Sequence, residues 1–216
     1  MNKGLLNIGG ALYNYDSAGI SNFEIGNATV NVGIYYGYNY NEGGIVRFLG
    51  NGRFAMNEGS KLIVSNKNYG NTDFYPDTNV NTNNSVIDKG EVQFGSEYTV
   101  WYDDINWVVK DRLPSIKTYK GVNIKNNIHL IGDLSVNNVF VDSATYIKLY
   151  KDSMGYNINL LGDTFENKGN IYADMSGSKI SFSGINKQVF INDNFNLAID
   201  SIIINNNNGL NIIGNV

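Results

Sequence analysis

The sequence predicts an all-β fold, a right-handed parallel β-helix, on three observations. Short runs in which apolar and polar residues alternate recur along the chain, and Gly or Asn follows most of them. About one residue in six is Asn, 24 are Gly and only 2 are Pro, a composition that favours turns over helices. No segment has the periodicity of an amphipathic helix; the nearest, 145–153, is short and rich in β-branched and aromatic residues. Alternation with period 2 places one face of each strand in a core, and Gly or Asn forms the corner after it.

The strand-like runs also predict the order of elements. Between residues 5 and 64 they follow one another closely and are separated by Gly-Gly and Gly-Asn corners. Residues 65–85 are rich in Asn, contain Pro76 and lack apolar spacing, so we expect a loop excursion there. Strand character with many aromatic residues returns over 86–109, and a second excursion is expected near 110–120, around Pro114. Residues 121–216 are regular again, so the whole chain, 1–216, is expected to form a single domain.

A sandwich or meander of antiparallel strands is the alternative fold, and two observations favour the β-helix over it. Two-residue hairpin signals between long strands are scarce. Asn occupies many corners, where stacked Asn side chains can form hydrogen-bonded ladders. The strands at both ends are apolar and have no evident cap, although an open solenoid end exposes unpaired backbone groups.

Composition limits the classes of partner and site. The net charge of −4, the pI near 4.9 and the lack of a basic stripe argue against nucleic acid, whose binders concentrate Lys and Arg. The chain has no Cys, which excludes disulfides and thiolate metal sites. It has no apolar run of the roughly 20 residues that a membrane span needs. We therefore expect no membrane insertion by this segment, and a monomer in isolation.

The acidic pair Asp103-Asp104 is the strongest candidate for catalysis, because it lies among aromatic residues in the segment WYDDINW. Glycoside hydrolysis requires two carboxylates at one site. Neighbouring residues of a strand point to opposite faces, so these two can share a site only at a bulge or turn. The single histidine, His129, lies in an apolar run and is expected to face outward beside core residues Ile128 and Leu130. Neither feature predicts a catalytic residue, a metal site or a cofactor.

Aromatic residues are the candidates for binding. Tyr and Trp combine a flat apolar face with a polar edge, which suits stacking on sugar rings while Asp and Asn bond the hydroxyls. The alternative is that these aromatic side chains fill the solenoid core or shield its sheets. Two groups meet the description, and their members are Trp101, Tyr102, Asp103, Asp104, Asn106 and Trp107 in the first and Tyr35, Tyr36 and Tyr38 in the second.

Segments 30–37, 43–48 and 52–62 resemble the pectate-lyase-like adhesive domains of large surface adhesins of Gram-positive commensal bacteria. This resemblance implies a β-helix that has lost the catalytic set and binds host or plant glycans and mucus. The Asn-rich, weakly charged texture is also similar to autotransporter passengers of Gram-negative bacteria. Both resemblances imply an extracellular place at the bacterial cell surface, with export and anchor signals outside this segment, which would be a piece of a larger surface protein.

The sequence therefore predicts a non-catalytic adhesive module that binds host or environmental glycan or glycoprotein through an exposed β-helix face or loop. Two alternatives stay open. The chain could be a polysaccharide-active β-helix enzyme, a lyase or hydrolase that uses Asp103 and Asp104, or a purely structural spacer.

Overall fold

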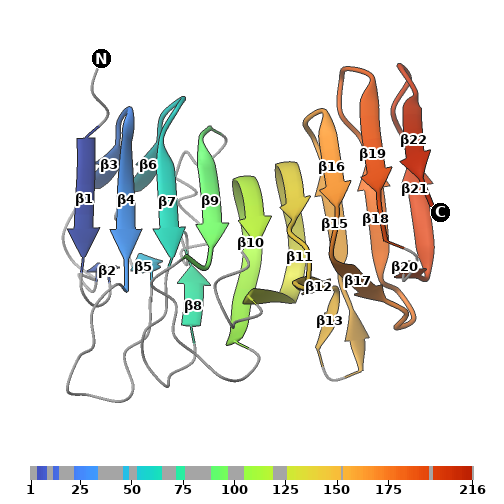
Figure 1. Ribbon diagram of the computed structural model, residues 1–216, viewed down its shortest axis with the longest axis horizontal. Helices are drawn as coiled ribbons and strands as arrows, with labels where there is room; N and C mark the ends of the chain where they lie inside the picture. Colours follow the sequence, from blue (N-terminus) through green and yellow to red (C-terminus); the bar gives the residue numbers. More distant parts are fainter. Residues whose placement is uncertain are drawn as a thin grey trace.

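The computed structural model describes residues 4–8, 12–14, 22–33, 46–48, 53–64, 72–75, 89–96, 105–118, 126–151, 153–194 and 197–215. These residues form strands and turns and include no helix, and hence no helix long and apolar enough to cross a membrane. Strands stand side by side along the long axis, from β1 (Gly4–Ile8) at one end to β22 (Leu210–Gly214) at the other (Figure 1). Nearly all pair in parallel with a strand one coil away, so the fold is the predicted parallel β-solenoid.

Three ladders of parallel strands run along the solenoid, and we name them faces A, B and C. Face A contains β2 (Leu12–Asn14), β5 (Val46–Phe48), β8 (Thr72–Tyr75), the first part of β10 (Ile105–Thr118), the first part of β11 (Asn126–Val141), β12 (Tyr146–Lys148), β17 (Asn170–Ala173) and β20 (Leu197–Ile199). Face B contains the middle of β10 and β11, β15 (Asn157–Leu160), β18 (Lys179–Phe182) and β21 (Ser201–Ile204).

Face C is the longest ladder. It contains β1, β4 (Ala28–Val32), β7 (Lys61–Val64), β9 (Glu91–Phe94), the ends of β10 and β11, β16 (Thr164–Asn167), β19 (Gln188–Asn192) and β22. β3 (Asn22–Ile25) and β6 (Arg53–Met56) form a separate parallel pair. They follow the face A strands β2 and β5 in the chain, just as the face B strands follow face A in the later coils. Each later coil visits faces A, B and C in turn, as β17, β18 and β19 do.

The two expected loop excursions contain strands. Within 65–85, β8 pairs in parallel with β5 and β10. Within 110–120, β10 continues to Thr118, and its ladder with β11 runs through Leu113 and Ser115 on either side of Pro114. Pro lacks a backbone N–H, and the ladder tolerates it because β10 turns from face B to face C there. The rest of these two segments lies outside the described residues.

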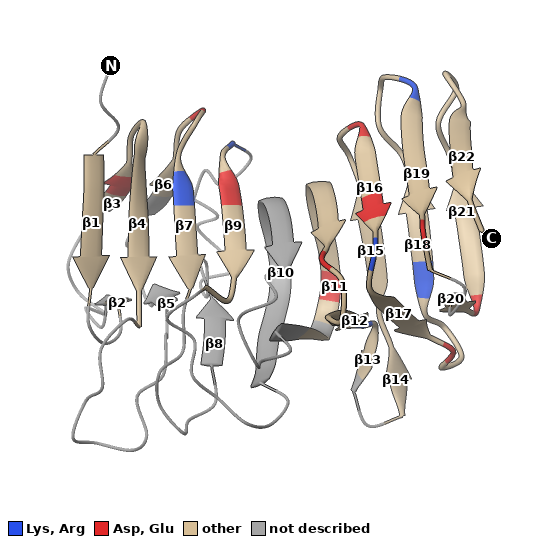
Figure 2. Cartoon of the chain, in the orientation of Figure 1, with Lys and Arg blue, Asp and Glu red and all other residues tan. Residues whose placement is uncertain are grey.

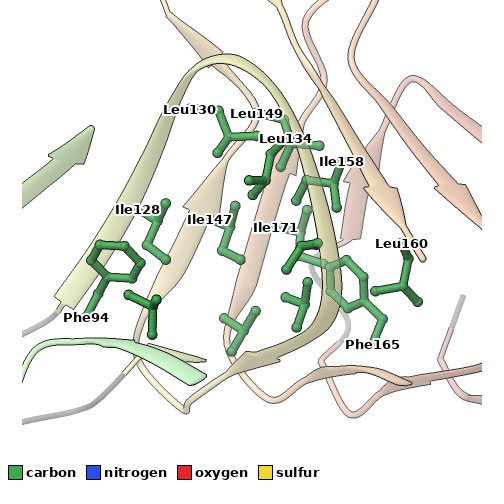
Figure 3. Close-up of a cluster of buried hydrophobic side chains, with 14 of the residues drawn as sticks. Phe94, Ile128, Leu130, Leu134, Ile147, Leu149, Ile158, Leu160, Phe165 and Ile171 are labelled. Carbon is green, nitrogen blue, oxygen red and sulfur yellow. The ribbon is translucent and has the colours of Figure 1, made fainter. Parts of the chain in front are cut away.

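Alternation of side chains builds the core. On face C, Val30, Leu62, Val92, Val139, Phe165 and Phe190 occupy one column of the ladder, and all are buried. Face A contributes Ile128, Ile147 and Ile171 in register, and face B contributes Leu134, Ile158 and Ile180. Figure 3 shows side chains of successive coils meeting inside the tube. Phe165, Phe182 and Phe190 pack ring against ring, with centroids 5.4–6.5 Å apart.

Asn side chains form ladders at the corners, as the sequence predicts. Asn167 donates from Nδ2 to Oδ1 of Asn192 one coil further on, at 2.7 Å, and both side chains are buried. Asn194 donates in the same way to Oδ1 of Asn170, at 2.8 Å. Asn138 accepts the backbone N–H of Thr164 in the next coil, at 2.9 Å. Such bonds satisfy polar groups where the chain leaves one strand ladder and enters another.

Apolar side chains are exposed at both ends of the described part of the solenoid. Leu5 and Leu6 at one end are 67% and 48% exposed, and Ile204 and Ile212 at the other are 53% and 43% exposed. Leu6 and Ile212 belong to the face C core column, so their exposure marks the place where that column runs out of neighbours. Figure 2 shows no charged residue on β1, β21 or β22.

Candidate functional site

The site residues predicted from the sequence lie outside the part of the chain whose side chains are described. The residues that fall outside the described ranges altogether are Trp101, Tyr102, Asp103, Asp104, Tyr35, Tyr36 and Tyr38. Asn106 and Trp107 belong to the backbone of β10, where they pair with Asn127 and Ile128. Residues 105–107 thus lie on face A, one coil before the strand that carries His129.

Face A carries a group of outward-facing aromatic and polar side chains, half-buried or exposed, that the sequence analysis did not select. We call it the aromatic strip, and its members are His129 of β11, Tyr146 and Lys148 of β12, Tyr150 of β13 (Tyr150–Lys151), Tyr172 of β17 and Asp174 just after β17. Ile147, Leu149, Ile171 and Ala173 alternate with these residues and are buried. The strip therefore lies on the outer surface of the face, where Tyr172 is 37% exposed.

Register brings the strip together across three coils. His129 pairs with Lys148, and Lys148 pairs with Tyr172, so these three form one outward column. The Tyr146 ring lies 5.4 Å from the His129 ring and 5.4 Å from the Tyr172 ring, the second contact being edge to face. His129 Nε2 and the Tyr146 hydroxyl are 2.9 Å apart and share a hydrogen bond. His129 faces outward between buried Ile128 and Leu130, as predicted.

Opposite charges flank the Tyr150 ring. Lys148 Nζ lies 4.3 Å from the ring centre, a distance at which a cation is attracted to an aromatic face. Burial raises the pKa of the Tyr150 hydroxyl, and the negative charge of Asp174 and a hydrogen bond to its carboxylate raise it further. The hydroxyl therefore stays protonated at neutral pH and donates to Asp174.

A small hairpin rises beside the strip and fixes Tyr150. β13 pairs antiparallel with β14 (Met154–Gly155), and this hairpin follows β12 in the chain and projects from the solenoid below β12 and β17 (Figure 1). Its base is closed by bonds to the next coil: Leu149 N–H donates to the Tyr172 carbonyl at 2.8 Å, and the Ser178 hydroxyl donates to the Leu149 carbonyl at 3.0 Å. Gly155 allows this approach, because a Cβ there would lie 2.5 Å from Ser178 N.

A shallow pocket of about 310 Å³ lies on face C, away from the strip. Its lining residues are Glu91, Phe140, Val141, Asp142, Glu166 and Lys168. Most of its charge is already compensated: Lys168 lies 2.6 Å from Glu166, and Lys61 lies 2.9 Å from Glu91. The hydrogen bond and charge of Glu166, together with the charges of Asp193 and Asp142, raise the pKa of Lys168 although desolvation opposes them. The described charges Glu166 and Glu91 of this pocket are thus engaged in ion pairs with Lys168 and Lys61.

Metal-ligating side chains do not cluster in the described ranges. There, no three His, Asp or Glu residues are placed to hold an ion together. The aromatic strip offers instead flat rings, a hydroxyl, an ammonium and a carboxylate on one open surface, and these groups suit non-covalent binding.

A sequence signal for the strip exists. In 146–150, Tyr, Lys and Tyr alternate with Ile and Leu, and in 170–174 Asn, Tyr and Asp alternate with Ile and Ala. The alternation predicts outward polar and aromatic residues on each strand, but their proximity depends on register. Tyr146 and Tyr172 are 26 positions apart in the sequence. The alternation within each strand does not indicate that these two residues become neighbours.

Comparison with family models, curated proteins and solved structures found no match to this chain. The fold is therefore known from the structure itself, and the resemblance to pectate-lyase-like adhesive domains stays a prediction.

Proposed function

We propose that the chain is a non-catalytic adhesive module of a bacterial cell-surface protein, and that it binds host or environmental glycan or glycoprotein through the aromatic strip. One observation carries the proposal: Tyr146, Tyr150 and Tyr172 gather at outward positions of one face, beside Lys148 and Asp174. Tyr172 is exposed and Tyr146 and Tyr150 are half-buried. Outward-facing tyrosines suit stacking on sugar rings, and the polar groups beside them suit hydroxyl recognition.

The solenoid supports this use of the strip. Its stacked strands hold the side chains of face A at fixed spacing, because each strand bonds to its neighbours in adjacent coils. A rigid, extended face lowers the entropic cost of binding, since few groups must be ordered when the ligand arrives.

The test measures retention of the purified chain on immobilised mucin, pectin and neutral polysaccharides. We expect retention of the unchanged protein, and a loss of about tenfold or more in affinity when Tyr146→Ala and Tyr172→Ala are combined, because stacking surface is removed. Phe140→Ala is the matched control, since it removes an aromatic ring from face C. Thermal melting of each variant verifies that the solenoid remains folded.

The same incubation separates the alternatives. New reducing ends or unsaturated products would identify a polysaccharide-active enzyme, and absence of retention on every surface would favour a spacer. Equal losses from the strip variant and from Phe140→Ala would refute the strip as the binding surface. The predicted group around Trp101 is tested separately with Trp101→Ala, which is expected to reduce retention as well. Trp107 is left unchanged in this test, because it pairs with Ile128, which is buried in the core.

A further inference from the structure

We infer that the ligand of the aromatic strip is an unbranched, uncharged glycan chain that lies along the solenoid axis and contacts one coil with each successive sugar. This inference rests on the proposed function and specifies its ligand. It follows from the register, the charge and the open shape of the strip.

Register gives the direction of the ligand. His129, Lys148 and Tyr172 occupy equivalent positions on three consecutive strands of face A. Neighbouring strands are about 4.8 Å apart, a rise comparable to the length of one sugar ring in an extended chain. A glycan that runs across the strands therefore meets one residue of this column with each sugar, whereas a chain that runs along a single strand leaves the column after one contact.

Charge gives the chemical class. Among the described side chains of the strip, Lys148 is the cation and Asp174 the anion, and both are directed to the Tyr150 side chain. The two charges balance, so the strip presents no excess of either sign to a ligand. An anionic polysaccharide would gain from Lys148 and lose to Asp174, while an uncharged one keeps the ring contacts and the hydroxyl bonds.

The open shape of the strip favours binding of an internal segment of a glycan and not of its terminal sugar. The strip lies on the outer surface of face A, where Tyr172 is 37% exposed, and the pocket on face C has no member of the strip in its lining. An open surface binds several consecutive sugars of a glycan through repeated shallow contacts, whereas recognition of a single terminal sugar requires an enclosed pocket. Affinity should therefore grow with chain length until the column is filled.

The experiment titrates the purified chain calorimetrically with neutral linear oligosaccharides, the cello-, xylo- and β-1,3-gluco- series from monosaccharide to hexasaccharide. Oligogalacturonates of the same lengths serve as the anionic comparison. In at least one neutral series we expect affinity to rise to about the trimer or tetramer and then level off, with little dependence on salt. Tyr172→Ala should lower the affinity of long chains about tenfold or more and flatten the length dependence. Phe140→Ala should leave both unchanged.

Three results would overturn the inference and leave the proposed function standing. These are tighter and salt-sensitive binding of oligogalacturonates, equal affinity for monosaccharide and hexasaccharide, and no binding of any soluble oligosaccharide while retention on mucin still depends on Tyr146 and Tyr172. Retention that does not depend on the strip at all would instead contradict the proposed function.

Discussion

At the scale of single residues, one glycine and one tyrosine set the geometry beside the strip. Gly155 lets the β13–β14 hairpin close against the next coil, because its missing side chain leaves room for Ser178. Tyr150 links the hairpin to face A through Lys148 on its ring and Asp174 on its hydroxyl. Both residues contact the next coil, so substitutions at either should alter the packing between two coils as well as their own strand.

Gly155→Ala should destabilise the protein by about 1–3 kcal/mol, because the added Cβ overpacks a backbone contact. It would lie 2.5 Å from Ser178 N and 2.8 Å from the Ser176 carbonyl oxygen. Gly26→Ala is the matched control, since a Cβ at Gly26 meets no atom within 4 Å, and it should change stability by no more than about 0.5 kcal/mol. Urea unfolding of both variants measures the difference, and equal midpoints would contradict the close approach of Gly155.

The Tyr150 hydroxyl should lose its proton at higher pH than an ordinary tyrosine. Burial and Asp174 raise its pKa in the folded protein. A raised pKa contributes stability that is complete below the unfolded value of about 10 and is lost as pH rises through the folded value. Asp174→Asn should move the pKa part of the way back, since burial remains.

Carbon-13 NMR of labelled tyrosine side chains follows this titration. Asp193→Asn is the control, because Asp193 acts on Lys168 rather than on Tyr150. A midpoint for Tyr150 that Asp174→Asn leaves unchanged would argue against the hydrogen bond between the two side chains.

At the scale of elements, each strand divides its residues between two environments. On β11 and β16, Val139 and Phe165 point into the core column, while their neighbours Phe140 and Glu166 pair on the outer surface. The same residue type therefore has opposite roles on one face. Phe165 packs against Phe182 and Phe190, whereas Phe140 is half buried and lines the face C pocket.

Phe165→Ala should cost about 3–5 kcal/mol of unfolding free energy, because it leaves a cavity between three coils. Phe140→Ala should cost clearly less, since its ring is partly in water already. Thermal and urea unfolding compare the two variants. A larger loss of unfolding free energy for Phe140→Ala than for Phe165→Ala would contradict the assignment of Phe165 to the core and of Phe140 to the outer surface.

At the scale of the whole molecule, the solenoid is a stack whose stability depends on neighbours. Inner strands such as β16 bond to strands on both sides, β11 and β19, while β1 and β22 have one described partner each. Cooperativity between adjacent coils should therefore be strongest in the middle and weakest at the two end strands.

Hydrogen exchange should reveal this gradient in the isolated chain. Amides of β15 to β19 are expected to exchange slowest, and those of β1 and β22 fastest, because the end strands expose one edge to water. Mass spectrometry of peptic fragments measures the rates. Protection of β22 equal to that of β16 would show that something covers the end, and repeating the measurement over a range of protein concentrations would identify self-association as the cause.

Much of the fold could be predicted from local patterns. Period-2 alternation places Ile128 and Leu130 inside and His129 outside whatever the partner strand is, and Asn at the corners anticipates the ladder of Asn167 and Asn192. The expected excursion near 110–120 is wrong over 110–118, because β10 turns a corner at Pro114 and continues its ladder with β11. The aromatic group around Trp101 stays a prediction.

The sequence by itself determined that this chain is a stack of short strands and which side of each strand faces the core, because both are set by neighbouring residues. Tertiary structure alone decided which strands are neighbours. Ile128 pairs with Ile147, 19 residues on, whereas Val30 pairs with Leu62, 32 residues on, so the coils differ in the number of residues they contain. No local pattern encodes those intervals, so the meeting of His129, Lys148 and Tyr172 on one surface became visible only in the folded chain.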